Sequence, residues 1–91
     1  MQLMLEHLPE RSRFQATVDG STCVVDYRLA HGVMTITHTG VPPAVQGRGI
    51  AAALVQSVLQ HAQAGGFKVS PQCSYVAAYM RRHPETAVLM A

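Results

Sequence analysis

The chain has 91 residues, of which 48% are hydrophobic and 13% are charged, and its formal net charge is +2 at pH 7. This composition excludes a disordered chain and favours one small globular domain over residues 1–91. The seven Lys and Arg residues are scattered apart from Arg81 and Arg82, which excludes a nucleic-acid footprint but is compatible with a small anionic ligand.

Cysteine usage and hydropathy predict a cytoplasmic protein that binds no membrane. Cys23 and Cys73 stand far apart without a CxxC spacing, which favours a reduced compartment and leaves a disulfide open. The N-terminus lacks the basic region of a signal peptide, and no segment reaches the roughly 20 apolar residues of a membrane span. The histidines show no spacing such as HExxH, so we expect no metal site.

Three antiparallel strands are expected in the first half of the chain. Apolar and polar residues alternate at 14–18, 23–29 and 34–36, which is typical of half-buried strands. The dipeptides Asp19-Gly20 and His31-Gly32 between these segments favour tight hairpin turns. Continued alternation predicts that His38 and Gly40 share the core-facing side of the third strand.

The period becomes helical after two prolines at 42 and 43. Apolar residues recur at helical spacing from Ile50 to Ala62, which predicts a helix of about four turns with one buried stripe. A short strand at 67–70 and a second helix from Cys73 to His83 follow. The expected fold is therefore α+β, with a mixed sheet and packed helices in the order β-β-β-α-β-α.

The stretch VQGRGIA places Gly47 and Gly49 where the first helix begins. Glycines at a helix start leave unpaired backbone N–H groups accessible at the positive end of the helix dipole. This geometry favours an anion, and Arg48 could add charge. The alternative is that the glycines only form a tight turn, because a bare GxG is common.

The residues QGRGIA resemble the acyl-CoA signature of the GNAT superfamily of N-acetyltransferases, in which Gln or Arg is followed by two residues, Gly, one residue, and Gly or Ala. The segments HTGVPPAVQGRGIAAALV and GGFKVSPQCSYVAAYMRRHPE are similar to the very short, single-domain branch of that superfamily. That branch shares an HT-x-VP stretch, a P-x-C stretch and a closing HP-E. The resemblance extends from about Leu5 to Leu89.

This resemblance implies a three-layer α/β variant of the fold, with a mainly antiparallel sheet, and direct acetyl transfer from acetyl-CoA to an amine. The acceptor would be a small amine, a lysine or an N-terminal amine, including one on a protein or peptide, and the chain would act as a monomer or weak homodimer. The resemblance assigns the pantetheine arm to Thr39, Gly40 and Val41. It assigns the pyrophosphate to Gln46, Gly47, Arg48, Gly49, Ile50 and Ala51.

The catalytic residues are less determined, because relatives with HT-E-VP carry a glutamate, a natural base, where this chain has Gly40. His38 is the nearest titratable substitute, unless it only supports the strand end. Cys73 begins a helix, where a thiol has a lowered pKa and could carry an acyl group, unless it only packs beside the cofactor. Cys73 and His38 are thus the catalytic candidates. The competing interpretation is a non-catalytic CoA-binding or protein-interaction module.

Overall fold

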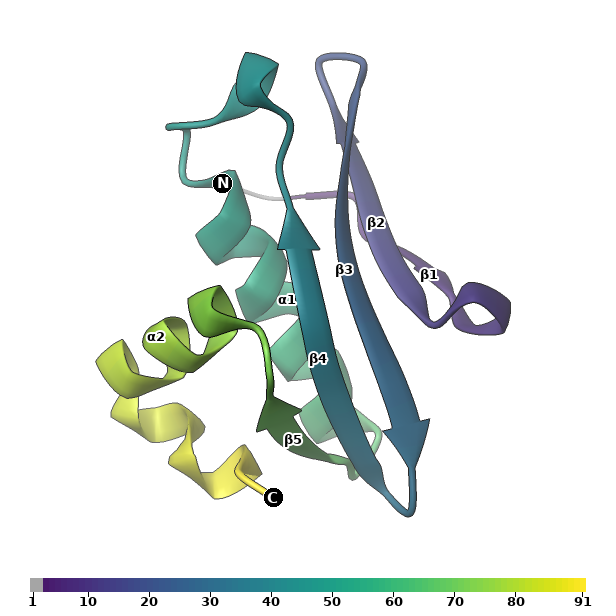
Figure 1. The fold of residues 1–91 in the computed structure, drawn as a ribbon, viewed down its shortest axis with the longest axis vertical. Helices are drawn as coiled ribbons and strands as arrows, with labels where there is room; N and C mark the ends of the chain where they lie inside the picture. The colour runs from purple at the N-terminus through teal and green to yellow at the C-terminus, as the bar shows by residue number, and fades with distance from the viewer. Residues whose placement is uncertain (1–2) are drawn as a thin grey trace.

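Five strands and two α-helices make up the computed structural model, which describes residues 3–91 (Figure 1). In chain order these elements and three short 3-10 helices are β1 (Glu6–Leu8), η1 (Pro9–Arg11), β2 (Arg13–Val18), β3 (Ser21–Ala30), β4 (Val33–Gly40), η2 (Pro43–Val45), α1 (Ile50–Ala64), β5 (Lys68–Pro71), α2 (Ser74–Arg82) and η3 (Pro84–Leu89).

The strands form one sheet in which neighbours along the chain are neighbours in space, in the order β1-β2-β3-β4-β5. The first three pairs are antiparallel and β4 pairs with β5 in parallel, with α1 as the crossover that a parallel pair requires. The predicted α+β class with a mixed, mainly antiparallel sheet is confirmed. Strand β1 is an addition to the expected order.

Both predicted hairpin turns are present. Asp19 and Gly20 have φ angles of 49° and 79°, and His31 and Gly32 have 52° and 75°. Two consecutive positive φ angles are the geometry of a type I′ turn, which matches the twist of the flanking strands. These turns explain why the strands at either side pair without an intervening loop.

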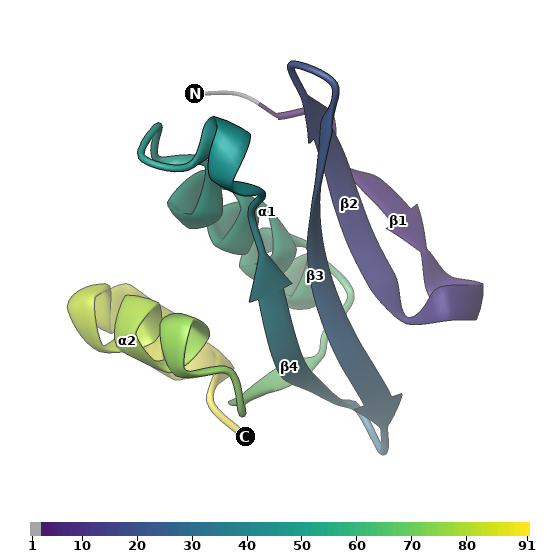
Figure 2. The same ribbon diagram turned by 45° about the horizontal axis from the view of Figure 1, so that its top comes forward.

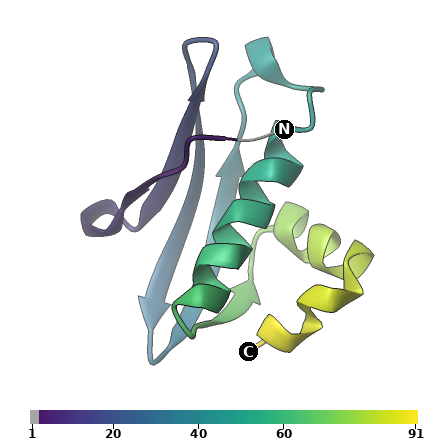
Figure 3. The ribbon, with the colours of Figure 1, turned by 180° about the vertical axis from the view of Figure 1, so that it is seen from behind.

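The core lies on one face of the sheet. The buried strand side chains that share this face are Phe14, Ala16, Cys23, Val25, Tyr27, Met34, Ile36 and Val69. The buried side of α1 is the predicted stripe, namely Ile50, Leu54, Val55, Val58, Leu59 and Ala62. Figure 3 shows α1 running along this face, and α2 contacts both α1 and the strands β4 and β5. The buried side chains of the sheet and the helices form one hydrophobic core.

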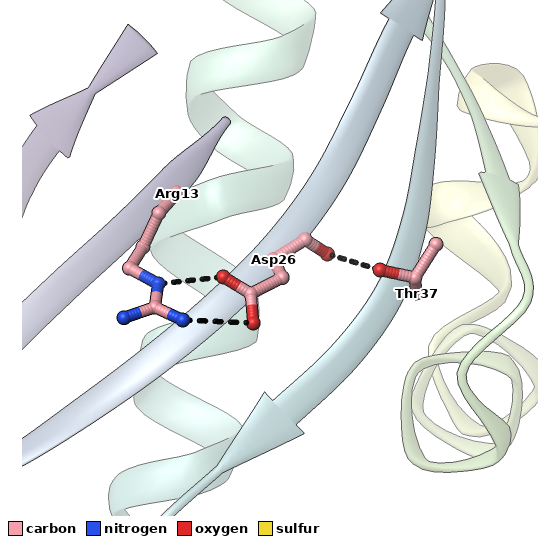
Figure 4. A network of polar contacts seen from close by, with 3 residues as sticks. All are labelled: Arg13, Asp26 and Thr37. Atoms are coloured by element: carbon pink, nitrogen blue, oxygen red, sulfur yellow. Dashed lines mark hydrogen bonds and ion pairs between the residues drawn. The ribbon is translucent and has the colours of Figure 1, made fainter. Parts of the chain in front are cut away.

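A β-bulge interrupts β4 before its end. Ile36 pairs with Tyr27, but His38 pairs with Asp26, so Thr37 is the extra residue. The Thr37 hydroxyl donates to the backbone oxygen of Asp26 at 3.3 Å (Figure 4). The Asp26 carboxylate accepts two hydrogen bonds from Arg13, at 2.6 and 3.2 Å. The network joins β2, β3 and β4 at the bulge.

The bulge reverses which side chains face the core, because one extra residue shifts the alternation by one position. Thr39 pairs with the fully buried Val25 and shares its face, whereas His38 pairs with Asp26 and is exposed. Gly40 shares the side of His38, since a Cβ at Gly40 would stand 3.0 Å from Nε2 of His38. The prediction that His38 and Gly40 face the core is therefore wrong.

Candidate functional site

The parallel strands β4 and β5 separate partway along β4. Their pairing ends at Ile36 and Pro71, and the N–H groups of Gln72 and Cys73 both donate to the oxygen of Ile36, at 3.0 and 2.9 Å. Beyond this point β4 pairs only with β3. The end of β4 thus has one open backbone edge, with hydrogen-bonding groups available to an extended ligand.

The segment between η2 and α1 has the backbone of an anion-binding loop. Gly47 and Gly49 have φ angles of 83° and 75°, and Gly49 is the N-cap of α1 without a side-chain cap. The first helical bond runs from the N–H of Ala53 to the oxygen of Gly49 at 3.1 Å. Among the described residues, no acceptor within the chain receives a hydrogen bond from the backbone N–H groups at 47–52. They are available to a phosphate at the helix N-terminus.

The space beside both glycines is open. A Cβ added at Gly47 or Gly49 would meet no atom within 4 Å. The glycines are therefore required by their positive φ angles rather than by crowding within the chain, and they leave the backbone accessible to a ligand. Figure 2 shows this segment beyond the end of β4, between η2 and the start of α1. These features fit the anion that the sequence predicts here and the diphosphate that the family resemblance implies.

The two polar side chains of the loop bind other parts of the chain. Nε2 of Gln46 donates to the oxygen of Val41 at 2.9 Å, which ties the loop to the residue that follows β4. Arg48 donates to the carboxylate of Asp19 in the turn between β2 and β3. Sequence analysis predicts only a turn-forming role for Asp19, because a contact between residues 29 positions apart has no local signal.

Cys73 lies at the N-cap of α2, beside the end of β4. Its half-buried thiol is 3.8 Å from Oγ1 of Thr39, which the bulge turns toward this side. Burial raises the pKa of the thiol. Hydrogen bonds from the backbone N–H of Val76, the side chain of Thr39 and the backbone N–H of Tyr75 lower the pKa, and together they outweigh burial, so that the net pKa is below its ordinary value. The site therefore increases the thiolate fraction of Cys73 relative to an ordinary thiol.

His38 lies on the other side of β4 from Cys73. Its exposed imidazole lies beside Gly40, where a Cβ at position 40 would be 3.0 Å from Nε2 of His38. Because neighbouring residues of the strand point to opposite faces, Thr39 is brought to the thiol and His38 is not. The structure thus joins Thr39 with Cys73 and Val41 with Gln46, and it does not form a Cys73–His38 pair.

Two cavities lie away from these residues. One of about 180 Å³ is bordered by α1, α2 and η3, and one of about 230 Å³ lies beside β5 and α2. Neither is lined by a candidate site residue. Within residues 3–91, no three His, Cys, Asp or Glu side chains are placed to hold a metal ion, and no helix has the length and apolar character to cross a membrane.

Comparison with known proteins places these features in a family context. The family model described as GCN5-related N-acetyl-transferase matches residues 13–89. Protein NATD1 of Mus musculus and of Gallus gallus are each 27% identical over 86 residues, covering 90% of this chain and 77% of theirs. The solution structure of a GCN5-like protein from Staphylococcus aureus superposes with a TM-score of 0.76 at 21% identity, covering 98% of this chain and 88% of that one.

Proposed function

Because this chain belongs to the GCN5-related N-acetyl-transferase family, we propose that it binds acetyl-CoA and transfers the acetyl group directly to an amine. The observation that carries the proposal is the combination of an uncapped helix N-terminus, opened by two glycines of positive φ, with a strand end that lacks a partner. The first binds a diphosphate and the second binds an extended amide-containing arm.

The chain's own groups divide the binding between them. Backbone N–H groups from Gly47 to Ala52 would hold the diphosphate, and Ile50 would contribute only its backbone because its side chain is buried in the core. The backbone of Thr39, Gly40 and Val41 would hold the pantetheine arm along the open edge of β4. Gln46 fixes the distance between these two parts through its bond to Val41.

Bound acetyl-CoA would supply an activated thioester to the amine. His38 is the base that we assign, because its imidazole fills the space at position 40 from which the glutamate of similar chains would extend. A neutral imidazole can accept a proton from the attacking amine. Its position on the uncovered sheet face also leaves room for a bulky acceptor.

Cys73 is assigned to packing and polar support beside the thioester rather than to acyl transfer. Its thiol lies on the Thr39 side of β4, away from the imidazole of His38. A covalent route would need Cys73 to accept the acetyl group and a separate base to activate the amine. Direct transfer needs only the amine, its base and the bound thioester, so it requires fewer groups of the chain.

Thermal unfolding and turnover test the proposal together. A ligand that binds only the folded chain at a hundredfold excess over its Kd adds about 2.7 kcal/mol of stability, so acetyl-CoA should raise the Tm. Acetyl-CoA with a panel of amines should release CoA, and His38→Gln should lower kcat while keeping the shift in Tm. A shift in Tm without CoA release for any amine would favour the non-catalytic CoA-binding module, and no shift at millimolar acetyl-CoA would exclude both.

A further inference from the structure

The arginine of the loop is paired with a carboxylate from a distant part of the sequence. Arg48 donates from Nη1 to Oδ2 of Asp19, in the turn between β2 and β3. Figures 1 and 3 show that this turn and the segment following β4 lie at the same end of the molecule. The two side chains are 47% and 67% exposed, so another anion can reach the guanidinium.

The sheet fixes the position of Asp19. The residues on either side of the turn, Val18 and Ser21, are paired in the ladder between β2 and β3, and the φ angles of Asp19 and Gly20 are those of a tight turn. Arg48, in contrast, is an exposed residue between two glycines. The rigid partner therefore decides where the guanidinium lies.

The ion pair also changes the charge that a ligand meets at the loop. The carboxylate neutralises Arg48, and the first turn of α1, residues 50–53, contains no charged side chain. A phosphate must therefore share the guanidinium with Asp19 or rely on the backbone N–H groups alone. Opposite charges in contact at a protein surface interact modestly, but they alter the local potential for a third charge.

We propose that Asp19 is a positioning residue of the phosphate loop. Its carboxylate holds Arg48 in the ion pair and thereby lowers the affinity of the loop for phosphate groups. This inference rests on the proposed acetyl-CoA site. With Asp19 in place, recognition depends on the fit of the diphosphate to the backbone N–H groups. Without it, a free guanidinium adds a charge-assisted contact that any phosphate can use.

The variant Asp19→Asn isolates the charge of the carboxylate. Asparagine tolerates positive φ, and Asn-Gly is a preferred type I′ turn, so the hairpin is retained. By titration calorimetry on the full chain, we expect both CoA and inorganic pyrophosphate to bind about two- to fivefold more tightly at low salt. The gain should shrink toward zero in 0.5 M NaCl, because salt screens exposed charges.

Two further variants separate this mechanism from a general charge effect. Glu10→Gln removes the same charge in η1, at the opposite end of β2 from the Asp19 turn (Figure 1), and should leave both affinities unchanged. In an Arg48→Ala background, Asp19→Asn should have no effect, because Asp19 acts through the guanidinium. Equal or weaker binding by Asp19→Asn, or a gain that persists without Arg48, would overturn the proposal. Absence of CoA binding in the unmodified chain would overturn the proposed function as well.

Discussion

At the residue scale, the two glycines of the loop matter more for binding than the arginine between them. Gly49→Val forces a β-branched residue to φ near +75° and fills the space that faces the backbone N–H groups. We expect it to abolish CoA binding, whereas Arg48→Ala should cost about 1 kcal/mol or less, because an exposed charge contributes little. Titration calorimetry measures both affinities.

Gly32→Val is the matched control for this prediction. Gly32 has the same φ angle of 75° and equally empty surroundings, but it lies in the turn between β3 and β4. The two variants should therefore lose similar stability, as measured by denaturant unfolding, and only Gly49→Val should lose CoA binding. Normal binding by a folded Gly49→Val would show that the loop is not the phosphate site.

The role of Cys73 is decided by whether an acetyl group ever resides on its sulfur. Direct transfer predicts that acetyl-CoA without an amine leaves the intact mass unchanged, and that Cys73→Ser keeps much of its activity, since the hydroxyl is of similar size. A thiolate-stabilising helix start makes the alternative chemically reasonable. A rapid, hydroxylamine-sensitive mass gain that Cys73→Ser removes would show an acyl-cysteine route instead.

The sequence predicts the site unevenly at this scale. Gly47 and Gly49 can be identified because a GxG at a helix start predicts positive φ angles from local sequence alone, and both residues adopt positive φ. The contact between Thr39 and Cys73 and the ion pair of Arg48 with Asp19 join residues far apart in the chain. No periodicity or spacing encodes such contacts, so they emerge only from the folded chain.

At the element scale, the bulge of β4 determines what the strand end presents. The Thr37 hydroxyl bonds the backbone of Asp26 at the bulge, so Thr37→Val removes that bond while keeping the branched shape. We expect a loss of about 0.5 to 1.5 kcal/mol in the free energy of unfolding. If the register relaxes, Thr39 leaves the thiol and the pKa of Cys73 rises.

Denaturant unfolding and the pH profile of thiol alkylation measure these two effects. Alkylation of the folded chain reports on Cys73, because Cys23 is fully buried. Thr35→Val is the control, since Thr35 lies on the same strand in regular pairing with Arg28 and Ser70. An unchanged alkylation profile in Thr37→Val would show that the hydroxyl does not maintain the register.

The elements with clear periods are those that the sequence predicts. The alternation in β2 and β3 and the helical stripe of α1 each repeat an apolar residue many times, and both patterns match the buried residues except at Leu29, which is 46% exposed. Strand β1 has only Glu6, His7 and Leu8, which is too short to show alternation. The bulge falls in the polar run from Thr37 to Gly40, where no apolar residue marks the core side.

At the scale of the whole molecule, β1 is attached through a group of aromatic rings. The imidazole of His7 stacks on Phe14 at a centroid distance of 4.2 Å, and its Nε2 lies 2.6 Å from the hydroxyl of Tyr27. The ring of His61, on α1, lies edge-on to the ring of His7 at a centroid distance of 4.8 Å. Two strands and the long helix thus meet around one titratable side chain of β1.

This arrangement makes the stability of the fold depend on pH. Burial lowers the pKa of His7 below 6.5 and the nearby His61 lowers it further, against a smaller opposite effect of Glu10. As the pH falls through 6.5, His7 therefore takes up a proton in the unfolded chain before it does so in the folded chain. The contribution of His7 to stability is complete above pH 6.5 and is lost as the pH falls through the lower folded-state pKa.

The free energy of unfolding, measured by urea titration between pH 5 and 8, should consequently fall with acidification from about pH 6.5 downward. His7→Gln keeps a group that can bond Tyr27 but cannot gain a proton, so its stability should be lower at pH 8, through lost stacking on Phe14, and should decline less toward pH 5. His61→Gln removes one cause of the lowered pKa and should flatten the decline in part. If His7→Gln declines as steeply as the unmodified chain, the acid sensitivity of the fold arises elsewhere than at the attachment of β1.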